Sequence, residues 1–174
     1  MPPRIPPLPL EKRAPEVADL PDMNIFGTLA HHPKLLARWS RFGGWLLARG
    51  RLSPRDRELA ILRTGFRCDA EYEFGQHVSI GLDAGLTREE VDRTVLDPAT
   101  AGWSDEDAVL LRAVDELHDD NRIGDATWAA LSQRYDEQQL IELCMVVGQY
   151  HLVAMTLNTL GVEREEGVPG FPGS

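Results

Sequence analysis

Apolar residues recur at every third or fourth position along most of this chain, which is the period of an α-helix. The clearest case is residues 33–50, where leucine, tryptophan and phenylalanine side chains fall on one face until Gly50 ends the pattern. We find no convincing run of the alternating pattern that a half-buried strand would show. The sequence therefore predicts an all-α fold, a bundle of seven or eight helices.

The length and composition suit a single domain. The chain has 174 residues, of which 43% are hydrophobic, and this is enough for one ordinary core. Six of the first fifteen residues are proline, so we expect residues 1–20 to form an extended arm, either disordered or laid against another surface. Residues 21–165 then form one all-α domain, and residues 166–174 form an irregular tail.

Several residues mark where helices begin. Ser53 followed by Pro54 predicts one start, and Thr87 with Glu90 predicts a capping box at another. The longest helix is expected over about residues 136–161 and is apolar nearly all round, so we place it at the centre of the bundle. Its apolar stretch also carries four polar side chains, which favours a buried helix over a membrane span.

The charge and the cysteines restrict the class of protein. The net charge is −10 and no cluster of basic residues occurs, so a nucleic acid is not expected as a partner. The two cysteines, Cys68 and Cys144, have neither disulfide-scaffold nor zinc-finger spacing. We predict a cytoplasmic protein that binds no membrane, with Cys144 as a small buried residue of the longest helix.

The polar stretch "CDAEYEFGQH", residues 68–77, lies between two apolar segments. Glu73 and His77 are four residues apart and share a helix face, so the carboxylate can orient the imidazole and raise its pKa. An exposed ion pair would explain this spacing equally well. However, Glu58 borders the apolar face of the preceding helix, and the short connection predicts antiparallel packing. We therefore expect Glu58 to approach His77 or Tyr72.

These residues carry a resemblance to a known family. The segment "LSPRDRELAILRTGFRCDAEYEFGQHVSIGLDAGLTREEV" resembles the core of the carboxymuconolactone decarboxylase family, which includes the AhpD-type alkylhydroperoxidases. The resemblance is strong over residues 35–95 and continues more loosely through "IELCMVVGQYHLVAMTLNTLGV". It implies an AhpD-like helical bundle that self-associates to a trimer or hexamer. The proline-rich arm is the segment expected to embrace a neighbouring copy.

The resemblance also implies site residues. AhpD-like peroxidases use a glutamate on the first core helix, a CxxC motif, and a histidine four residues after the second cysteine. In this chain the glutamate corresponds to Glu58 and the histidine to His77, whereas the two cysteine positions hold Ala70 and Glu73. The acid and the base are present and both thiols are missing. Cys68 lies two residues before the first of these positions.

We therefore expect a lyase of the lactone-decarboxylase type that needs no cofactor and no metal. It would transfer protons on a small carboxylated, lactone-type substrate. His77 would act as general acid or base, and Glu58 would tune it or relay its proton. Tyr72 and Glu73 would shape the pocket or orient His77.

Three other functions remain open at this point. Cys68 could support a peroxidase, with peroxiredoxin activity, if an outside thiol or Cys144 completed the cycle. The chain could instead be a non-catalytic oligomeric protein that binds a ligand. Finally, Glu58, Glu73 and His77 offer two carboxylates and an imidazole that could bind manganese or iron.

The remaining histidines are weaker candidates. His31 and His32 are expected to be capping or surface residues, and His118 a solvated helix end. His151 is either a satisfied core histidine or a further residue of the pocket. It follows a second Gly-Gln pair at residues 148–149, which echoes the pair at residues 75–76 and hints at an old duplication.

Overall fold

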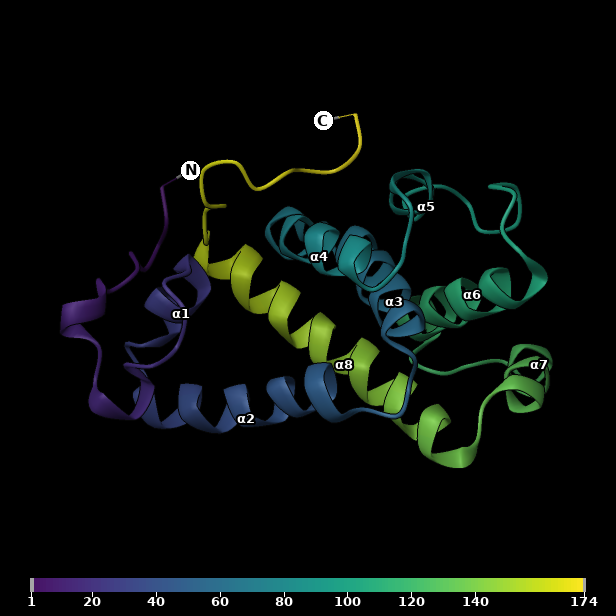
Figure 1. The fold of residues 1–174 in the computed structure, drawn as a ribbon, viewed down its shortest axis with the longest axis horizontal. Coiled ribbons are helices and arrows are strands. Elements are labelled where there is room, and N and C mark those ends of the chain that lie inside the picture. Colours follow the sequence, from purple (N-terminus) through teal and green to yellow (C-terminus); the bar gives the residue numbers. More distant parts are fainter. Residues whose placement is uncertain (1, 174) are drawn as a thin grey trace.

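The computed structural model describes residues 2–173, and within them the chain forms eight α-helices, two short 3₁₀ helices and no strand (Figure 1). The prediction of an all-α fold with seven or eight helices is confirmed. The α-helices are α1 (Asn24–Leu29), α2 (Pro33–Arg49), α3 (Pro54–Arg67), α4 (Glu71–Asp83), α5 (Arg88–Arg93), α6 (Asp105–Asp120), α7 (Asp125–Arg134) and α8 (Glu137–Leu160).

The helices begin and end where the capping residues predicted. The Ser53 side chain accepts a hydrogen bond from a backbone N–H in the first turn of α3. Thr87 and Glu90 form a capping box at α5, and Asp136 forms a second one at α8. Gly161 ends α8 in the left-handed conformation, with φ of 67°.

Helix α3 forms the centre of the bundle, because α4, α6 and α8 all pack against it (Figure 1). Ten of its residues are buried, a continuous run from Asp56 to Gly65. The junction to α4 is tight: Cys68 caps α3, and Asp69 adopts a left-handed φ of 52°. Helix α4 therefore starts at Glu71 and returns antiparallel to α3.

Helix α8 differs from the prediction, because only one of its faces is buried. Ile141, Met145, Leu152 and Met155 are 48–66% exposed. Cys144 is exposed as well, so its prediction as a buried core residue is wrong. Periodicity cannot distinguish a fully buried helix from one whose second apolar face lies on the surface.

The length and composition of α8 would also suit a membrane span, and it is the one such helix among the described residues. Within the qualifying window, 56% of the residues are buried inside the protein. The core helix of a soluble protein has the same properties, so this observation is weak support for a membrane span.

The N-terminal arm lies against its own chain. It contains the 3₁₀ helices η1 (Leu10–Lys12) and η2 (Pro15–Val17). The Leu8 N–H donates to the carbonyl of Gly27 at 2.9 Å, which ties the arm to α1. A Cβ on Gly27 would collide with the arm at Pro7, so glycine is needed for this approach. Of the two predicted outcomes, the arm is laid against a surface, and that surface belongs to the same molecule.

Within the described residues, the C-terminal tail passes over α4 without forming a helix (Figure 1). The Phe171 ring contacts the rings of Phe66 and Phe74 edge-on, with centroids 5.6 and 5.1 Å apart. Gly75 of α4 allows the backbone of the tail to come close, because a Cβ there would collide with the carbonyl of Pro169. The tail is thus docked on the helix that carries His77.

Candidate functional site

The antiparallel packing of α3 and α4 brings Glu58 against His77, as the sequence predicted. Oε2 of Glu58 lies 2.6 Å from Nδ1 of His77, and the Glu58 side chain is completely buried. The second carboxylate oxygen accepts a hydrogen bond of 2.9 Å from Nε of Arg57. Glu58 is thus a buried carboxylate held by two charged partners, which compensate for its loss of hydration.

The other ring nitrogen of His77 faces Glu73, one helical turn back on α4. Nε2 lies 3.2 Å from Oε1 of Glu73. Burial alone would lower the pKa of His77, but the hydrogen bonds to Glu58 and Glu73 outweigh it and raise the pKa to about 9. At neutral pH His77 is therefore an imidazolium that donates one N–H to each carboxylate.

This arrangement argues against the manganese or iron site that the sequence left open as an alternative. The two carboxylates bind opposite nitrogens of the same ring, so Glu58 and Glu73 approach His77 from different sides. A shared ion needs its ligand atoms to converge on one point. The three residues are instead organised to hold a proton.

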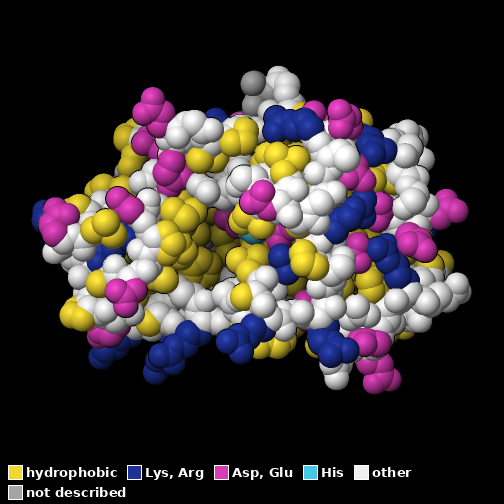
Figure 2. Space-filling view, in the orientation of Figure 1, with side chains coloured by type: hydrophobic (Ala, Val, Ile, Leu, Met, Phe, Trp, Pro, Cys, Tyr) yellow, Lys and Arg dark blue, Asp and Glu magenta, His cyan; other side chains and the backbone are white. Residues whose placement is uncertain are grey.

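A pocket of about 450 Å³ opens onto Glu73 and His77 from between α1, α2, α4 and α8. Figure 2 shows the face of the molecule with a hollow walled by hydrophobic side chains and with histidine and acidic atoms in its depth. Most of the lining is apolar, while a few polar groups converge there, as in small-molecule sites. The apolar lining includes Ile25, Phe26, Trp39, Leu47, Ile80 and Val153, and the polar lining includes Ser40, Tyr72, Glu73, Gln76, His77 and Gln149.

Tyr150 of α8 also lines this pocket, and sequence reasoning did not predict it. Its ring packs edge-on against the His77 ring, with centroids 4.9 Å apart and an interplanar angle of 89°. Burial raises the pKa of Tyr150, so it keeps its phenolic proton. The sequence did contain a sign of this role. Gly148-Gln149-Tyr150 on α8 repeats the Gly-Gln pattern of Gly75-Gln76-His77 on α4, with Tyr150 in the place of His77.

Two further lining residues have unsatisfied polar atoms. Nε1 of Trp39 and Oγ of Ser40 are buried and have no hydrogen-bond partner among the described residues. A buried N–H or hydroxyl without a partner costs free energy, so such groups are often found where a ligand binds. Both residues are on α2, opposite α4 across the pocket.

Tyr72 lines the pocket, but its hydroxyl is hydrogen-bonded to neighbouring segments of the chain. It donates to Oε1 of Glu165, the residue just before the tail, at 2.8 Å and accepts from the Ile25 N–H at 3.3 Å. Burial is the main cause that raises the pKa of Tyr72, so the phenol stays neutral. Tyr72 thereby links α1, α4 and the segment that leads into the tail beside the pocket.

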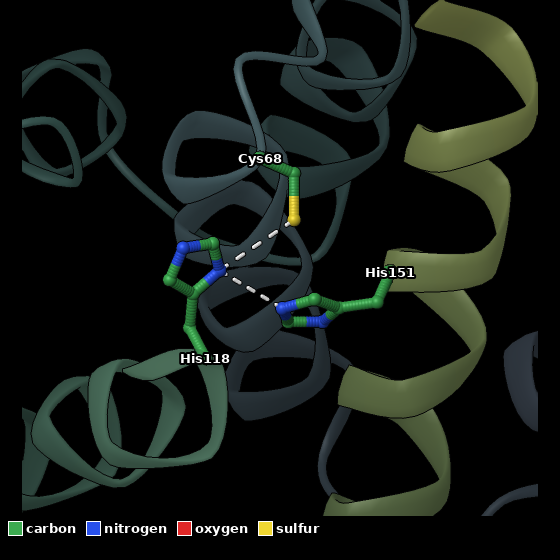
Figure 3. Close-up of side chains that lie close together, drawn as sticks. All are labelled: Cys68, His118 and His151. Carbon is green, nitrogen blue, oxygen red and sulfur yellow. Dashed lines mark hydrogen bonds between the residues drawn. The ribbon is translucent and has the colours of Figure 1, made fainter. Parts of the chain in front are cut away.

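Cys68 lies apart from these residues. It does not line the pocket; its Sγ is 3.7 Å from Nδ1 of His118 on α6 (Figure 3). That same Nδ1 is 2.9 Å from Nε2 of His151 on α8. The expectation that His118 is a solvated helix end is wrong, because the ring is half-buried in this cluster, and His151 faces the cluster instead of the pocket.

The structure thus brings together Glu58, Tyr72, Glu73 and His77, and separates Cys68 from them. Sequence reasoning missed Arg57 and Tyr150. His31 and His32 are at the surface, as expected, with His32 at the start of α2.

The model of the carboxymuconolactone decarboxylase family matches residues 33–116, which include Glu58, Glu73 and His77. None of the curated proteins matches the chain.

Three solved structures share the fold. The AhpD-core, peroxidase-related protein from Ralstonia eutropha JMP134 has a TM-score of 0.77 at 19% identity, and the match covers 93% of each chain. A peroxidase-related protein from Silicibacter sp. TM1040 has a TM-score of 0.75 at 13% identity, covering 85% of this chain and 79% of the other.

The third structure is a putative antioxidant defence protein AhpD from Agrobacterium tumefaciens. It has a TM-score of 0.69 at 12% identity, and the match covers 79% of this chain and 94% of that one. At these identities the likeness concerns the fold alone, and the reaction must be argued from the residues. Residues 33–116 thus resemble the carboxymuconolactone decarboxylase family, and the chain shares its helical fold with AhpD-core proteins.

Proposed function

We propose that this protein is a cofactor-free lyase that removes carbon dioxide from a small carboxylated, lactone-type substrate. The observation that carries the proposal is the buried row Glu58–His77–Glu73, which places an imidazolium in the depth of an apolar pocket. A group held protonated at neutral pH is a general acid, and such groups contribute typically about 10²–10⁴-fold to a rate.

These residues can supply the proton that the reaction requires. When the bond to the carboxylate carbon breaks, carbon dioxide leaves and its electron pair stays on the substrate as a carbanion or enolate. That carbon then takes the Nε2 proton of His77, since Nε2 faces Glu73, which lines the pocket, whereas Nδ1 is bonded to Glu58. Glu58 keeps hold of Nδ1–H and orients the ring, and a solvent proton restores the imidazolium. Glu73 is placed to guide that proton back to Nε2.

The pocket walls favour the same reaction. An ionised carboxylate is costly to bury among apolar side chains, and its loss as neutral carbon dioxide relieves that cost. The unsatisfied Trp39 N–H and Ser40 hydroxyl offer hydrogen bonds to a carbonyl or lactone oxygen of the substrate. His77 lines the same pocket and would supply the proton.

A second candidate is a thiol peroxidase that uses Cys68. What favours it is the imidazole of His118, 3.7 Å from the thiol, together with the peroxidase-related structural neighbours. Burial, however, raises the pKa of Cys68, which lowers the fraction of reactive thiolate. Both cysteines are free, and Cys144 is on the exposed face of α8. The lyase is therefore the better supported reading.

Self-association is part of the proposal. The exposed apolar face of α8, formed by Ile141, Met145, Leu152 and Met155, is the surface that we assign to contacts between copies of the chain. A trimer or hexamer, as the family resemblance implies, would bury it. The cytoplasmic location stays a prediction from the sequence.

The test is direct turnover. Purified protein is incubated with carboxymuconolactone and with a set of small lactone carboxylates, and released carbon dioxide is measured alongside loss of hydrogen peroxide. Decarboxylation that His77→Gln removes and Cys68→Ser leaves intact supports the lyase. Peroxide consumption that depends on Cys68 would support the peroxidase. Ligand binding without turnover of any compound would favour a non-catalytic binding protein and contradict the lyase.

A further inference from the structure

We propose that Cys68, His118 and His151 form a second site, which binds a borderline-soft transition-metal ion such as Zn²⁺. These three side chains come from the end of α3, from α6 and from α8, and they point toward one another (Figure 3). Their ligand atoms Sγ, Nδ1 and Nε2 all lie within 4.8 Å of one another. The site shares no residue with the pocket around His77.

Two of the three distances between these atoms are close to those of a tetrahedral metal site, and the third is within 4.8 Å. With Zn–N near 2.05 Å and Zn–S near 2.3 Å, tetrahedral geometry puts two nitrogens about 3.3 Å apart and a nitrogen and a sulfur about 3.6 Å apart. In this structure the two nitrogens are 2.9 Å apart, and Sγ of Cys68 is 3.7 Å from Nδ1 of His118. Changes of well under an ångström in these two distances would reach the metal-bound values.

The protonation pattern also suits a metal. Nδ1 of His151 donates to the Val147 carbonyl at 2.8 Å, which fixes the proton on that nitrogen. The other nitrogen, Nε2, therefore directs its lone pair at the cluster. A histidine that binds a metal through one nitrogen almost always donates the other N–H to a carbonyl or carboxylate, and Val147 supplies that partner. Without an ion, His118 Nδ1–H donates to the same lone pair.

The backbone around Cys68 is held from two sides. Its N–H donates to the Thr64 carbonyl at 2.9 Å, and its carbonyl accepts from Nδ2 of Asn158 at 2.9 Å. The second bond comes from α8, the helix that also carries His151. Asp69 follows in the left-handed conformation, which sets the chain direction at this point. A ligand whose backbone is fixed before binding loses less conformational entropy when the ion arrives.

The surrounding charge is compatible with a cation. Arg67 is next to Cys68, but its guanidinium pairs with Asp115 at 3.1 Å and with Asp119 at 2.6 Å. These two carboxylates offset the positive charge that would otherwise repel a divalent ion. All three ligand residues are only half-buried, so a hydrated ion can reach them from solvent.

The donor set decides the class of ion. One thiolate and two imidazoles suit zinc, cobalt or copper, and they disfavour magnesium and calcium, which prefer oxygen ligands. Three protein ligands also leave a fourth tetrahedral position for water or another ligand, unlike a closed structural site with four protein ligands. The structure therefore points to an open site that can hold a metal-bound water.

The experiment is a cobalt titration of the full-length protein after treatment with a chelator. Tetrahedral Co²⁺ bound to a thiolate gives strong visible bands and a sulfur-to-metal charge-transfer band. We expect one Co²⁺ per chain, displaced by added Zn²⁺, and a rise in the melting temperature with either ion. Cys68→Ser should remove the charge-transfer band, and His118→Gln and His151→Gln should each weaken binding by at least about tenfold.

Two matched variants serve as controls. Cys144→Ser removes the other thiol of the chain, and His32→Gln removes a surface imidazole, so both should bind Co²⁺ like the unaltered protein. Far-UV circular dichroism establishes that each variant is folded. The proposal is overturned if the folded protein binds no Co²⁺ at about 1 mM. It is equally overturned if the charge-transfer band survives in Cys68→Ser or disappears in Cys144→Ser.

Discussion

Nδ1 of His77 lies 2.6 Å from Oε2 of Glu58, although 19 residues separate the two along the chain. The contact joins α3 to α4 inside the core, where neither side chain can exchange its partner for water. It gives the protein an imidazolium that is held in place from behind by Glu58. The reaction proposed above, and two of the following predictions, depend on this contact.

Replacing His77 by glutamine should lower decarboxylation by about 10²–10⁴-fold, because glutamine keeps the size and some hydrogen bonds but cannot donate an acidic proton. The turnover number is the quantity to compare, with released carbon dioxide as the readout. Asp83→Asn, an exposed position on the same helix, is the matched control and should keep full activity. Equal turnover in the unaltered protein and His77→Gln would exclude His77 as the acid.

The raised pKa of His77 predicts a stability that falls with rising pH. The pKa is about 9 in the folded protein against an ordinary value of 6.5. The folded state therefore binds the proton more tightly, and this stabilisation is complete below about pH 6.5 and lost as the pH rises through about 9. A rise of this size in the pKa corresponds to about 3 kcal/mol.

Urea unfolding at pH 6 and pH 9.5 measures this effect. Other groups titrate in the same range, so the relevant quantity is the difference in unfolding free energy between the unaltered protein and His77→Gln. That difference should shrink at the higher pH. A difference that does not change with pH would show that the pKa of His77 is not raised in the folded protein.

Gly75→Ala should release the C-terminal tail, since the added Cβ would collide with the Pro169 carbonyl. We expect a loss of about 1–3 kcal/mol in unfolding free energy and faster proteolysis of the tail. Gly44→Ala is the control: a Cβ there meets no atom within 4 Å, and alanine is the better helix former by about 1 kcal/mol. If both variants behave alike, the tail is not held by this close approach.

Glu142 holds the loop between α2 and α3. Its carboxylate is buried and accepts the backbone N–H groups of Arg51 and Leu52 at 2.6 and 3.1 Å. Glu142→Ala leaves both donors without a partner and should cost about 1–3 kcal/mol or more in unfolding free energy. Gln138→Ala, exposed on the same helix, should change it by less than about 0.5 kcal/mol. Chemical denaturation of the two variants decides whether Glu142 has this role.

A lysine on the exposed face of α8 should dissociate the assembly that we propose. Leu152 and Leu96 are both 51% exposed, so they form a matched pair of apolar surface positions. Leu152→Lys should reduce the particle mass measured by light scattering, because an unpaired charge would be buried between copies. Leu96→Lys, after α5, should leave the mass unchanged. A monomeric unaltered protein would refute the assembly itself.

Much of the fold was predictable because its signals are local. Capping residues such as Ser53, Thr87 and Asp136 determine where helices begin within a few residues of sequence, and the structure confirms them. The contact of Glu58 with His77 could also be predicted from the sequence, since a short connection between two helices forces antiparallel packing. The exposed face of α8 could not, because a helix that is apolar on every side gives no sign of which side meets solvent.

The cluster around Cys68 has no local signature at all. His118 is 50 residues from Cys68, and His151 is a further 33 residues along the chain. Only the packing of α6 and α8 against α3 brings the three together. A sequence pattern read one helix at a time shows three unrelated polar residues here, and it cannot show that they share one point in space.

Tyr150 and His151 are adjacent on α8, yet one contacts His77 and the other contacts His118. Consecutive helix residues project about 100° apart, so one turn of α8 forms a wall of each site. A substitution at either residue can therefore disturb both the His77 pocket and the Cys68 cluster. The changes in activity and metal binding caused by a double substitution should depart from the sum of those caused by the single ones. An experimenter who alters one centre must assay the other in the same preparation.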